Sequence, residues 1–188
     1  MAKTKRNKKN GLTVRELTIG DAYAYFQIAN DASLRRYTSF FMASSLSEAR
    51  ARIEKFTSHY EKIFGLFNKA NRLVAVFDVD SNSVEDFDEG IRSATVSYFV
   101  GKDYRGRGLA STGIKLLAKE LVSQYDSFVF EIHSTNNYSI GVQEALGSEK
   151  HANYENYVFF TYALSWFSFL PMIEPRNIFR GCFLFLFV

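Results

Sequence analysis

The chain has 188 residues and a formal net charge of +3, a length that suits one domain with a sizeable core. Five positive charges precede Gly11, and without them the rest of the chain carries a formal charge of about −2. This near-neutral body excludes a basic domain that binds DNA through its whole surface. The single cysteine, Cys182, excludes an internal disulfide and a cysteine-rich metal site, and it fits a reducing compartment.

Residues 1–11 form a polar, basic segment that predicts a disordered arm. Two interpretations stand for this arm: a solubilising tail, or electrostatic attraction to RNA, the ribosome or another acidic partner. No apolar stretch follows the charges, so we expect no secretory signal and a cytoplasmic protein.

The region before residue 30 predicts a strand followed by a short helix. Apolar residues alternate with polar ones at Leu12, Val14 and then Leu17, as in a half-buried strand. Asp21 is expected to cap the helix that follows. The apolar face of that helix is expected to hold Ala22, Tyr23, Phe26 and Ala29.

A second amphipathic helix is predicted after Ser45–Glu48, which has the form of a capping box. Apolar residues recur every three or four positions as far as Ile63, so we expect one helix that ends near Gly65. The segment Gly65–Asp78 then indicates a β-hairpin around the polar turn Asn68–Arg72.

A group of carboxylates follows the hairpin, at Asp80, Glu85, Asp86, Asp88 and Glu89. Such a stretch is typical of a solvated loop that joins two strands. The alternative interpretation is a surface that attracts a cationic amine substrate. The sequence leaves both interpretations open.

The centre of the chain predicts a strand, a glycine-rich turn and a helix. Thr95–Val100 is β-branched and aromatic, which suits a strand, and apolar residues have helical spacing between Leu109 and Leu121. The first turn of a helix offers unpaired N–H groups and the positive end of its dipole to an anion. Within the turn, Gly106 and Gly108 would let a phosphate approach the backbone closely, and two arginines beside them add positive charge.

Three kinds of turn compete for this pattern. A phosphate-binding P-loop needs a Gly-Lys-Ser/Thr ending, which is missing here. A dinucleotide fingerprint is closer, because Gly106-x-Gly108 opens a helix and Glu131 follows at about the right distance. However, Ser111 stands where its third glycine should be, and too little chain follows for a second βαβ half. An ordinary strand-to-helix turn on a basic surface is the remaining alternative.

The second half of the chain completes an α/β fold. Phe128–His133 indicates another strand, and the helix between the two strands predicts a β-α-β crossover with parallel strands. A short helix from Asn136 to Gly147 and a last hairpin over Lys150–Leu164 follow. We therefore expect a mixed, mostly antiparallel sheet with one parallel β-α-β crossover and helices on both faces.

Two motifs resemble those of the GNAT superfamily of acyl-CoA-dependent N-acyltransferases. Every specified position of its motif A, the turn that wraps the pyrophosphate of acetyl-CoA, is filled in Val100-GKDY-Arg105-GR-Gly108-L-Ala110. Its acceptor-proximal motif is matched by Asn136-NY-Ser139-IGVQEAL-Gly147, with Ser148 where a Phe is usual. Together with the opening LTVRELTIGDA, the Ser form is most like the branch that acetylates ribosomal-protein N-termini at serine or alanine.

The resemblance covers residues 12–165 and implies a GNAT domain that uses acetyl-CoA as co-substrate, without a metal. It implies that the backbone of the strand contacts the pantetheine arm and that the turn and the two helix starts hold the phosphates and the thioester. The residues concerned are Tyr98, Phe99, Val100, Arg105, Gly106, Arg107, Gly108, Leu109, Ala110, Ser111, Asn136 and Ser139.

Catalysis requires a group that takes a proton from the amine and one that stabilises or protonates the departing thiolate. Glu131 is the first candidate for the base, directly or through water, because it is expected on the strand beside the thioester. His133 is the second, because an imidazole changes its charge near neutral pH. Strand alternation places both on one face. An ordinary polar pair at a strand end is the alternative. Many GNAT enzymes carry a Tyr acid at the position of Gln143, so the resemblance points instead to Ser139, with Tyr138 as a nearby substitute.

The implied activity is transfer of an acetyl group to a primary amine, either a protein N-terminus or a small amine. A non-catalytic CoA-binding or partner-binding module on the same fold is the alternative, and ribosome association through the basic arm is a third hypothesis. Residues 166–188 form a hydrophobic extension that finishes in the apolar run Phe183–Val188. This run is too short to span a bilayer, which needs about 20 residues. Three roles are open for this extension: an extra strand of the sheet, a homodimer contact, or contact with a membrane surface.

Overall fold

The computed structural model describes residues 11–55, 61–81, 91–151 and 153–164. The expected basic arm, most of the acidic stretch and the 166–188 extension, including Cys182, lie outside the described residues. The contacts of the chain divide it into two compact units. The first holds the residues up to Asp78 together with Tyr98–Leu117, and the second holds Val79–Ser97 and the residues from Ala118 onward.

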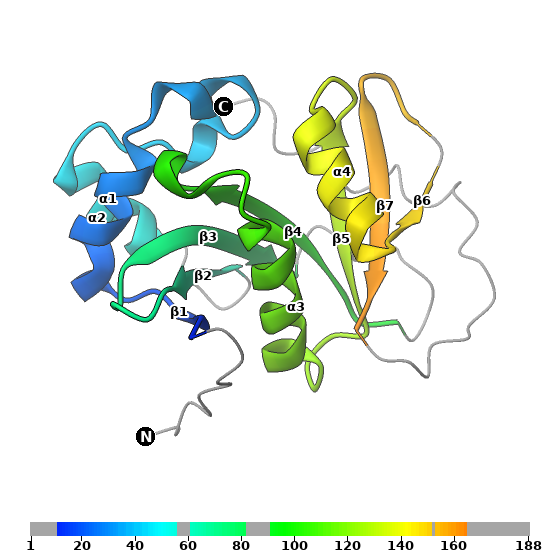
Figure 1. The fold of residues 1–188 in the computed structure, drawn as a ribbon, viewed down its shortest axis with the longest axis horizontal. Helices are drawn as coiled ribbons and strands as arrows, with labels where there is room; N and C mark the ends of the chain where they lie inside the picture. The colour runs from blue at the N-terminus through cyan, green and yellow to red at the C-terminus, as the bar shows by residue number, and fades with distance from the viewer. Residues whose placement is uncertain (1–10, 56–60, 82–90, 152, 165–188) are drawn as a thin grey trace. The chain divides into compact units, whose positions relative to one another are not determined.

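Seven strands form one mixed sheet in the described part of the chain, in the order β1-β2-β3-β4-β5-β7-β6 (Figure 1). The strands β4 and β5 are parallel, with partners from Ser93↔Ser127 to Thr95↔Val129, and the sheet is otherwise mostly antiparallel. This confirms the predicted fold class. The strands are β1 Thr13–Glu16, β2 Glu61–Phe67, β3 Leu73–Asp80, β4 Ser93–Val100, β5 Ser127–His133, β6 Glu149–Lys150 and β7 Tyr157–Ala163.

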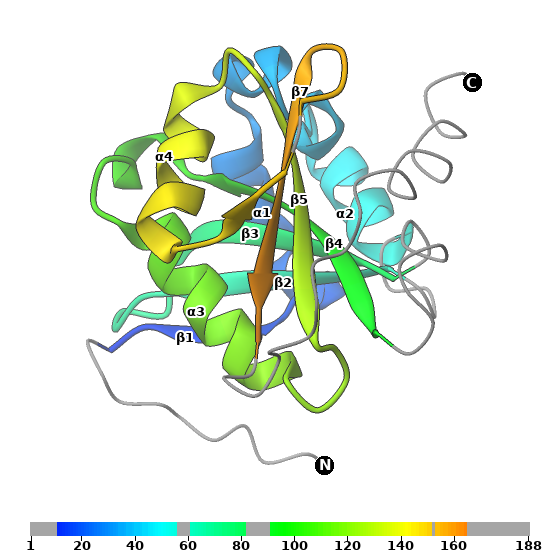
Figure 2. The same ribbon diagram turned by 90° about the vertical axis from the view of Figure 1, so that its right-hand side faces the viewer.

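Four α-helices lie within the described residues: α1 Ala22–Ala29, α2 Leu46–Lys55, α3 Leu109–Leu121 and α4 Asn137–Leu146. Short 3₁₀ helices lie before or between them, namely η1 Ile19–Asp21, η2 Ala32–Arg36, η3 Ser39–Phe41 and η5 Lys102–Tyr104. Figure 2 shows α3 and α4 from the side. No helix in the described ranges is both long enough and apolar enough to cross a membrane.

Neighbouring residues of β3 show that helices cover both faces of the sheet in the first unit. Val76 belongs to the buried cluster formed with α1 and α2. The next side chain, Phe77, points to the opposite face, where its ring lies against Gly113 of α3. A Cβ on Gly113 would lie 2.2 Å from Cζ of Phe77, so the glycine allows the helix to pack closely on the strand.

The core of the first unit contains three aromatic rings that support the end of β4. Tyr25 is fully buried and its hydroxyl donates to the carbonyl oxygen of Phe41 at 2.7 Å. Phe99 packs against both rings, with centroid distances of 6.3 Å to Tyr25 and 5.0 Å to Phe41. Phe99 precedes the last residue of β4, so this cluster fixes the point where the glycine-rich turn begins.

The expected helix that continues to Gly65 is wrong. Helix α2 covers Leu46–Lys55 of the described residues, and Ile63 lies in β2. This strand pairs with β1 from Thr13↔Phe67 to Glu16↔Phe64. The apolar spacing is misleading here because Ile63–Phe67 of β2 are all buried, so apolar residues of the strand also fall at helical intervals. The hairpin of β2 and β3 is confirmed, and β2 begins earlier than expected.

Two local predictions about the helices differ in detail. Tyr23 is 64% exposed, and the buried face of α1 holds Ala22, Tyr25 and Ala29. The Asp21 carboxylate does not cap α1. It accepts two hydrogen bonds from the Arg15 guanidinium, at 2.7 and 2.8 Å, and one from the Thr18 N–H at 2.9 Å.

The second unit holds β5 in place from both sides. On one side, β7 pairs with the whole strand, from Ser127↔Ala163 to His133↔Tyr157. On the other side, the start of β4 is joined to it by a buried hydrogen bond between the Ser93 and Ser127 hydroxyls at 2.7 Å. An exposed ion pair between Arg92 and Asp126, at 2.9 Å, lies just before both strands.

Candidate functional site

The turn between β4 and α3 has the backbone conformation that its glycines permit. Gly106 and Gly108 have φ angles of +73° and +68°, in the left-handed region that L residues rarely adopt. The first helical hydrogen bond of α3 runs from the Thr112 N–H to the Gly108 carbonyl oxygen at 3.1 Å. The N–H groups of the three residues between them therefore have no partner inside the helix, which is the arrangement that attracts an anion.

Open space faces the backbone at both glycines. A Cβ on Gly106 would meet no atom within 4 Å, and one on Gly108 would meet only the Ser111 hydroxyl at 3.9 Å. Conformation rather than crowding therefore explains these two glycines. On the side where a Cβ would lie, no described atom covers the backbone of either glycine at less than 3.9 Å.

Leu109, Ala110 and Ser111 form the first turn of α3. Leu109 and Ser111 are half-buried and Ala110 is buried. The Ser111 hydroxyl donates to the Gly108 carbonyl oxygen at 3.0 Å, so it stabilises the start of the helix. These residues present their backbone, and not charged side chains, at the helix N-terminus.

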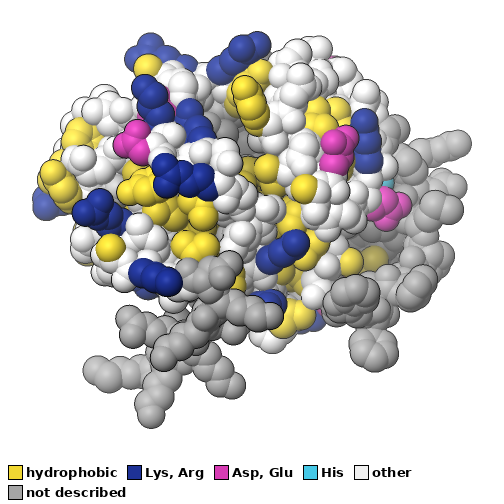
Figure 3. Space-filling view, viewed as in Figure 1, with side chains coloured by type: hydrophobic (Ala, Val, Ile, Leu, Met, Phe, Trp, Pro, Cys, Tyr) yellow, Lys and Arg dark blue, Asp and Glu magenta, His cyan; other side chains and the backbone are white. Residues whose placement is uncertain are grey.

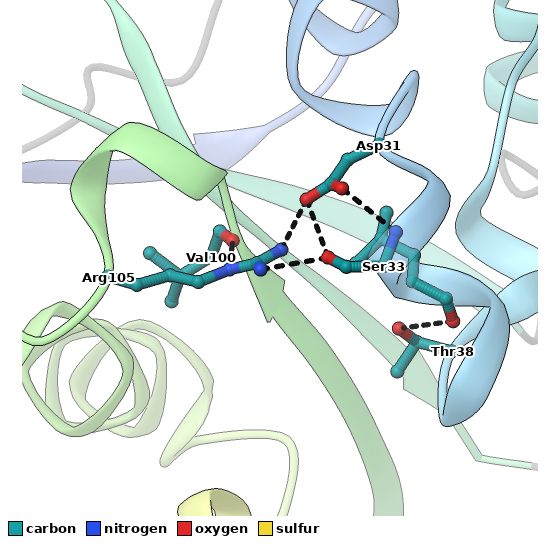
Figure 4. Close-up of polar contacts among 6 residues, drawn as sticks. Asp31, Ser33, Thr38, Val100 and Arg105 are labelled. Carbon is teal, nitrogen blue, oxygen red and sulfur yellow. Dashed lines mark hydrogen bonds and ion pairs between the residues drawn. The ribbon is translucent and has the colours of Figure 1, made fainter.

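Arg105 is held by a set of three hydrogen bonds that joins the turn to η2 (Figure 4). Its Nε donates to the Val100 carbonyl oxygen at 3.0 Å, and Nη1 donates to the Ser33 hydroxyl at 2.9 Å. Nη2 forms an ion pair with Oδ2 of Asp31 at 2.6 Å. Asp31 also accepts from the Ser33 N–H at 2.9 Å, which makes it the N-cap of η2.

The Asp31 carboxylate is stabilised in its charged form. Burial raises its pKa, but hydrogen bonds from the Ser33 N–H and hydroxyl and the charge of Arg105 outweigh that effect, so the pKa lies below its usual value. The Asp31 side chain is only 14% exposed, whereas that of Arg105 is 40% exposed. The ion pair is therefore better shielded from water than an ordinary surface pair.

Arg107 differs from Arg105 in its partner. Its Nη2 donates to the carbonyl oxygen of Asp103 at 2.8 Å, and within the described ranges no carboxylate forms an ion pair with it. The positive charge of Arg107 is therefore balanced less directly than that of Arg105. Figure 3 shows Lys and Arg side chains gathered over the elements of the first unit.

The last residues of β4 have different surroundings. Phe99 is a core residue, only 4% exposed. Tyr98 is half-buried, and its ring lies 6.2 Å from that of Phe77. Val100 bonds Arg105 through its carbonyl oxygen, so the strand end and the turn form one hydrogen-bonded structure.

The second unit places the two candidate bases on β5. Glu131 is exposed and His133 is half-buried. Phe130, before Glu131, and Ile132, between the two candidates, are buried, as strand alternation predicts. The His133 ring packs edge-on against Tyr157, at 5.5 Å between centroids. Its Nδ1 lies 2.9 Å from the Thr135 hydroxyl and 3.3 Å from the Thr135 backbone nitrogen, so Thr135, just after the strand, holds the ring in place.

The start of α4 carries the remaining candidates. The Asn136 side chain accepts from the Ser139 N–H at 3.3 Å, so Asn136 is the N-cap of the helix. The Ser139 side chain is half-buried, and no described residue bonds its hydroxyl. Tyr138 is 90% exposed and points into solvent.

Two features escaped the sequence analysis. The Asp31-Ala32-Ser33 segment has the pattern of a helix cap, but nothing in the sequence shows that its partner is Arg105, more than 70 residues away. Gln143 is fully buried, and its amide oxygen accepts from the Ser148 hydroxyl at 2.8 Å. The two positions where the chain departs from the GNAT motif thus bond each other.

Gln143 also leaves one polar atom unsatisfied. Its Nε2 is buried without a hydrogen-bond partner among the described residues. No group of three or more His, Cys, Asp or Glu side chains in the described ranges is placed to hold a metal ion.

The sequence and the fold of this chain were compared with those of known proteins. The sequence matches the family model of the acetyltransferase (GNAT) domain over residues 11–149. A search of curated proteins finds no match to the sequence.

Solved structures share the fold at low sequence identity. The ribosomal L7/L12 alpha-N-protein acetyltransferase RimL, in complex with coenzyme A, has a TM-score of 0.69 and 15% identity, covering 82% of this chain and 95% of its own. The ribosomal-protein-S5-alanine acetyltransferase from Vibrio fischeri has a TM-score of 0.65 and 14% identity, with 84% and 96% covered. Spermidine N-acetyltransferase from Vibrio cholerae, in complex with CoA and spermine, has a TM-score of 0.64 and 16% identity. The match covers 81% of this chain and 94% of the spermidine enzyme. At these identities the likeness shows the fold.

Proposed function

Because the chain belongs to the GNAT acetyltransferase family, we propose that it transfers the acetyl group of acetyl-CoA to a primary amine. The observation that carries this proposal is the turn after β4. Two glycines in the left-handed region, uncovered on their Cβ side, precede the N–H groups at the start of α3. Arg107 lies beside them, and no carboxylate among the described residues forms an ion pair with it. These are the features that a pyrophosphate requires.

The acceptor is proposed to be a protein or peptide N-terminus, as in the ribosomal-protein acetyltransferases that share the fold, or a small amine. The Ser139 form of the α4 motif and the opening of the domain support the peptide N-terminus. The structural similarity to the spermidine enzyme supports the small amine. Both acceptors are neutral nucleophiles only after a proton has left the nitrogen.

In the reaction, the amine nitrogen forms a bond to the acetyl carbon while the carbon–sulfur bond breaks. Glu131 is proposed as the base that takes the proton from the amine, directly or through water, with His133 as the second candidate. Ser139 is proposed to donate a hydrogen bond to the departing thiolate, with Tyr138 as its substitute. The exposed position of Glu131 and the available hydroxyl of Ser139 support these assignments.

A second candidate function is a CoA-binding module without catalysis. The observation that favours it is the environment of Tyr138 and Gln143. Tyr138 is 90% exposed, and Gln143, at the position of the family's Tyr acid, is buried and held by Ser148. A module of this kind would bind CoA and release no thiol.

Free-thiol release from acetyl-CoA tests the proposal and separates the two functions. The assay compares N-terminal Ser and Ala peptides of ribosomal proteins with spermidine, and calorimetry with acetyl-CoA runs beside it. We expect release with one acceptor class, at least tenfold loss in Glu131→Gln, and near-wild-type rates in Glu120→Gln, which removes an exposed carboxylate from α3. CoA binding without release for any acceptor would favour the non-catalytic module, and no binding by the folded protein would refute both.

A further inference from the structure

The contacts of Arg105 differ from those expected of a residue that serves only as positive charge. Three of its N–H groups reach three acceptors, and two of those acceptors belong to η2, more than 70 residues earlier in the chain. A guanidinium that only attracted phosphate would need none of these bonds. The arrangement instead fixes the position of the turn relative to η2.

The bonds among these residues form a closed ring. The Ser33 hydroxyl accepts from Nη1 of Arg105 and donates to Oδ2 of Asp31 at 2.9 Å, and that same oxygen accepts from Nη2. Each polar group therefore has a partner that is itself held in place. The ring is anchored in the core, because Leu34 of η2 is only 5% exposed and belongs to the buried cluster.

The charges of the turn are divided between its two arginines. Asp31 balances the charge of Arg105, whereas Arg107 has a backbone carbonyl oxygen as its only bonding partner among the described residues. The Nε bond of Arg105 to Val100 joins the last residue of β4 to the residue that precedes Gly106. The shape of the turn thus depends on Arg105, and the attraction of an anion depends on Arg107 and the helix N-terminus.

We propose that Asp31 and Ser33 are positioning residues of the CoA-binding turn and act on it through the guanidinium of Arg105. The inference rests on the proposed function, since it concerns how the same turn binds CoA. By its charge alone, the Asp31 carboxylate would repel a phosphate, but through Arg105 it strengthens CoA binding. If Asp31 instead competed with the phosphates for Arg105, removing its charge would strengthen binding.

Calorimetry with coenzyme A and four variants tests the proposal. Asp31→Asn keeps an oxygen that can cap η2 and removes the ion pair, and Arg105→Lys keeps the charge but loses the three-pronged geometry. We expect both to weaken CoA binding by about tenfold or more. We expect Ser33→Ala to weaken it by about threefold and Ser33→Thr, which keeps the hydroxyl, to restore it.

The control is Asp126→Asn, which removes the same charge from an ion pair of the second unit. It is expected to change CoA affinity by less than about twofold. Thermal unfolding of each variant, measured beside this control, shows whether a variant has lost its fold. The pattern of Ser33→Ala and Ser33→Thr gives a readout that general destabilisation does not produce.

Three outcomes would overturn the inference. Wild-type affinity in both Asp31→Asn and Arg105→Lys would show that the ring does not position the turn. Tighter binding in Asp31→Asn would show competition. If the folded wild type binds no CoA, the proposed function fails first and takes the inference with it, so the two failures are distinguishable.

Discussion

Two glycines share a left-handed backbone conformation, but only one of them lies in the turn proposed to bind CoA. Gly108 and Gly147 have φ angles of +68° and +74°, one in the turn before α3 and the other at the end of α4. An added Cβ would meet only the Ser111 hydroxyl at 3.9 Å in the first case and nothing within 4 Å in the second. Gly108→Ala and Gly147→Ala therefore cause no clash, and each tests conformation alone.

The expected loss of stability follows from these angles. A left-handed conformation costs an L residue about 1–2 kcal/mol. Replacing glycine recovers about 0.4–1 kcal/mol because the unfolded chain loses freedom. Each variant should therefore lose about 1 kcal/mol of unfolding free energy, or about 2–4 °C in Tm for a domain of this size.

The two variants should differ in CoA affinity. Relief of the strain at Gly108 rotates the backbone next to the free N–H groups of α3, so we expect about tenfold weaker binding or more. Gly147→Ala should bind as the wild type does. Calorimetric titration with coenzyme A and differential scanning calorimetry measure both quantities on the same samples.

The CoA affinity and the Tm of these variants test the two expectations separately. Equal CoA affinity in Gly108→Ala and the wild type, together with the expected loss of stability, would show that the backbone of the turn does not hold the phosphates. An unchanged Tm in both variants would show that the left-handed angles carry no strain.

Three other predictions concern stability. Gly113→Ala should lower the unfolding free energy by about 1–3 kcal/mol in chemical denaturation, because its Cβ would lie 2.2 Å from the Phe77 ring, and Phe77→Leu in the same chain should recover part of the loss. The pKa of Asp21 is lowered chiefly by its hydrogen bond from the guanidinium of β1, so its contribution to stability is present above the usual carboxylate range and is lost as the pH falls through the lowered pKa. Asp21→Asn should flatten this acid limb in thermal unfolding from pH 7 to pH 2, and an unchanged limb would contradict the assignment. Ser148→Ala should cost about 1–3 kcal/mol by leaving Gln143 unpaired, and adding Gln143→Leu should recover most of it in denaturant unfolding.

Local patterns carried much of the fold prediction. The strand, turn and helix from Thr95 to Leu121 were readable because β-branched runs, glycines and helical spacing each depend on nearby residues alone. The start of β2 was not readable. Five consecutive buried residues, Ile63–Phe67, follow its charged beginning, and such a run satisfies a helical spacing as well as a strand spacing.

The candidate site divides in the same way. The glycine-rich turn and the helix that begins at Asn136 follow from local chemistry, and the structure has both, with positive φ at Gly106 and Gly108 and Asn136 as N-cap. The partner of Arg105 and the burial of Gln143 depend on contacts with distant or packed groups. No local pattern distinguishes an arginine that faces a ligand from one that bonds a carboxylate elsewhere in the chain.

The sequence by itself determined the fold class, the order of most elements and the position of the glycine-rich turn, because these follow from the spacing of apolar residues and from backbone preferences. Only the tertiary structure decided that Asp31 and Ser33 hold Arg105 and that Ser148 pairs with Gln143. The physical reason is range. Propensity and hydrophobic pattern act over a few residues, whereas a hydrogen bond depends on where folding brings its two partners.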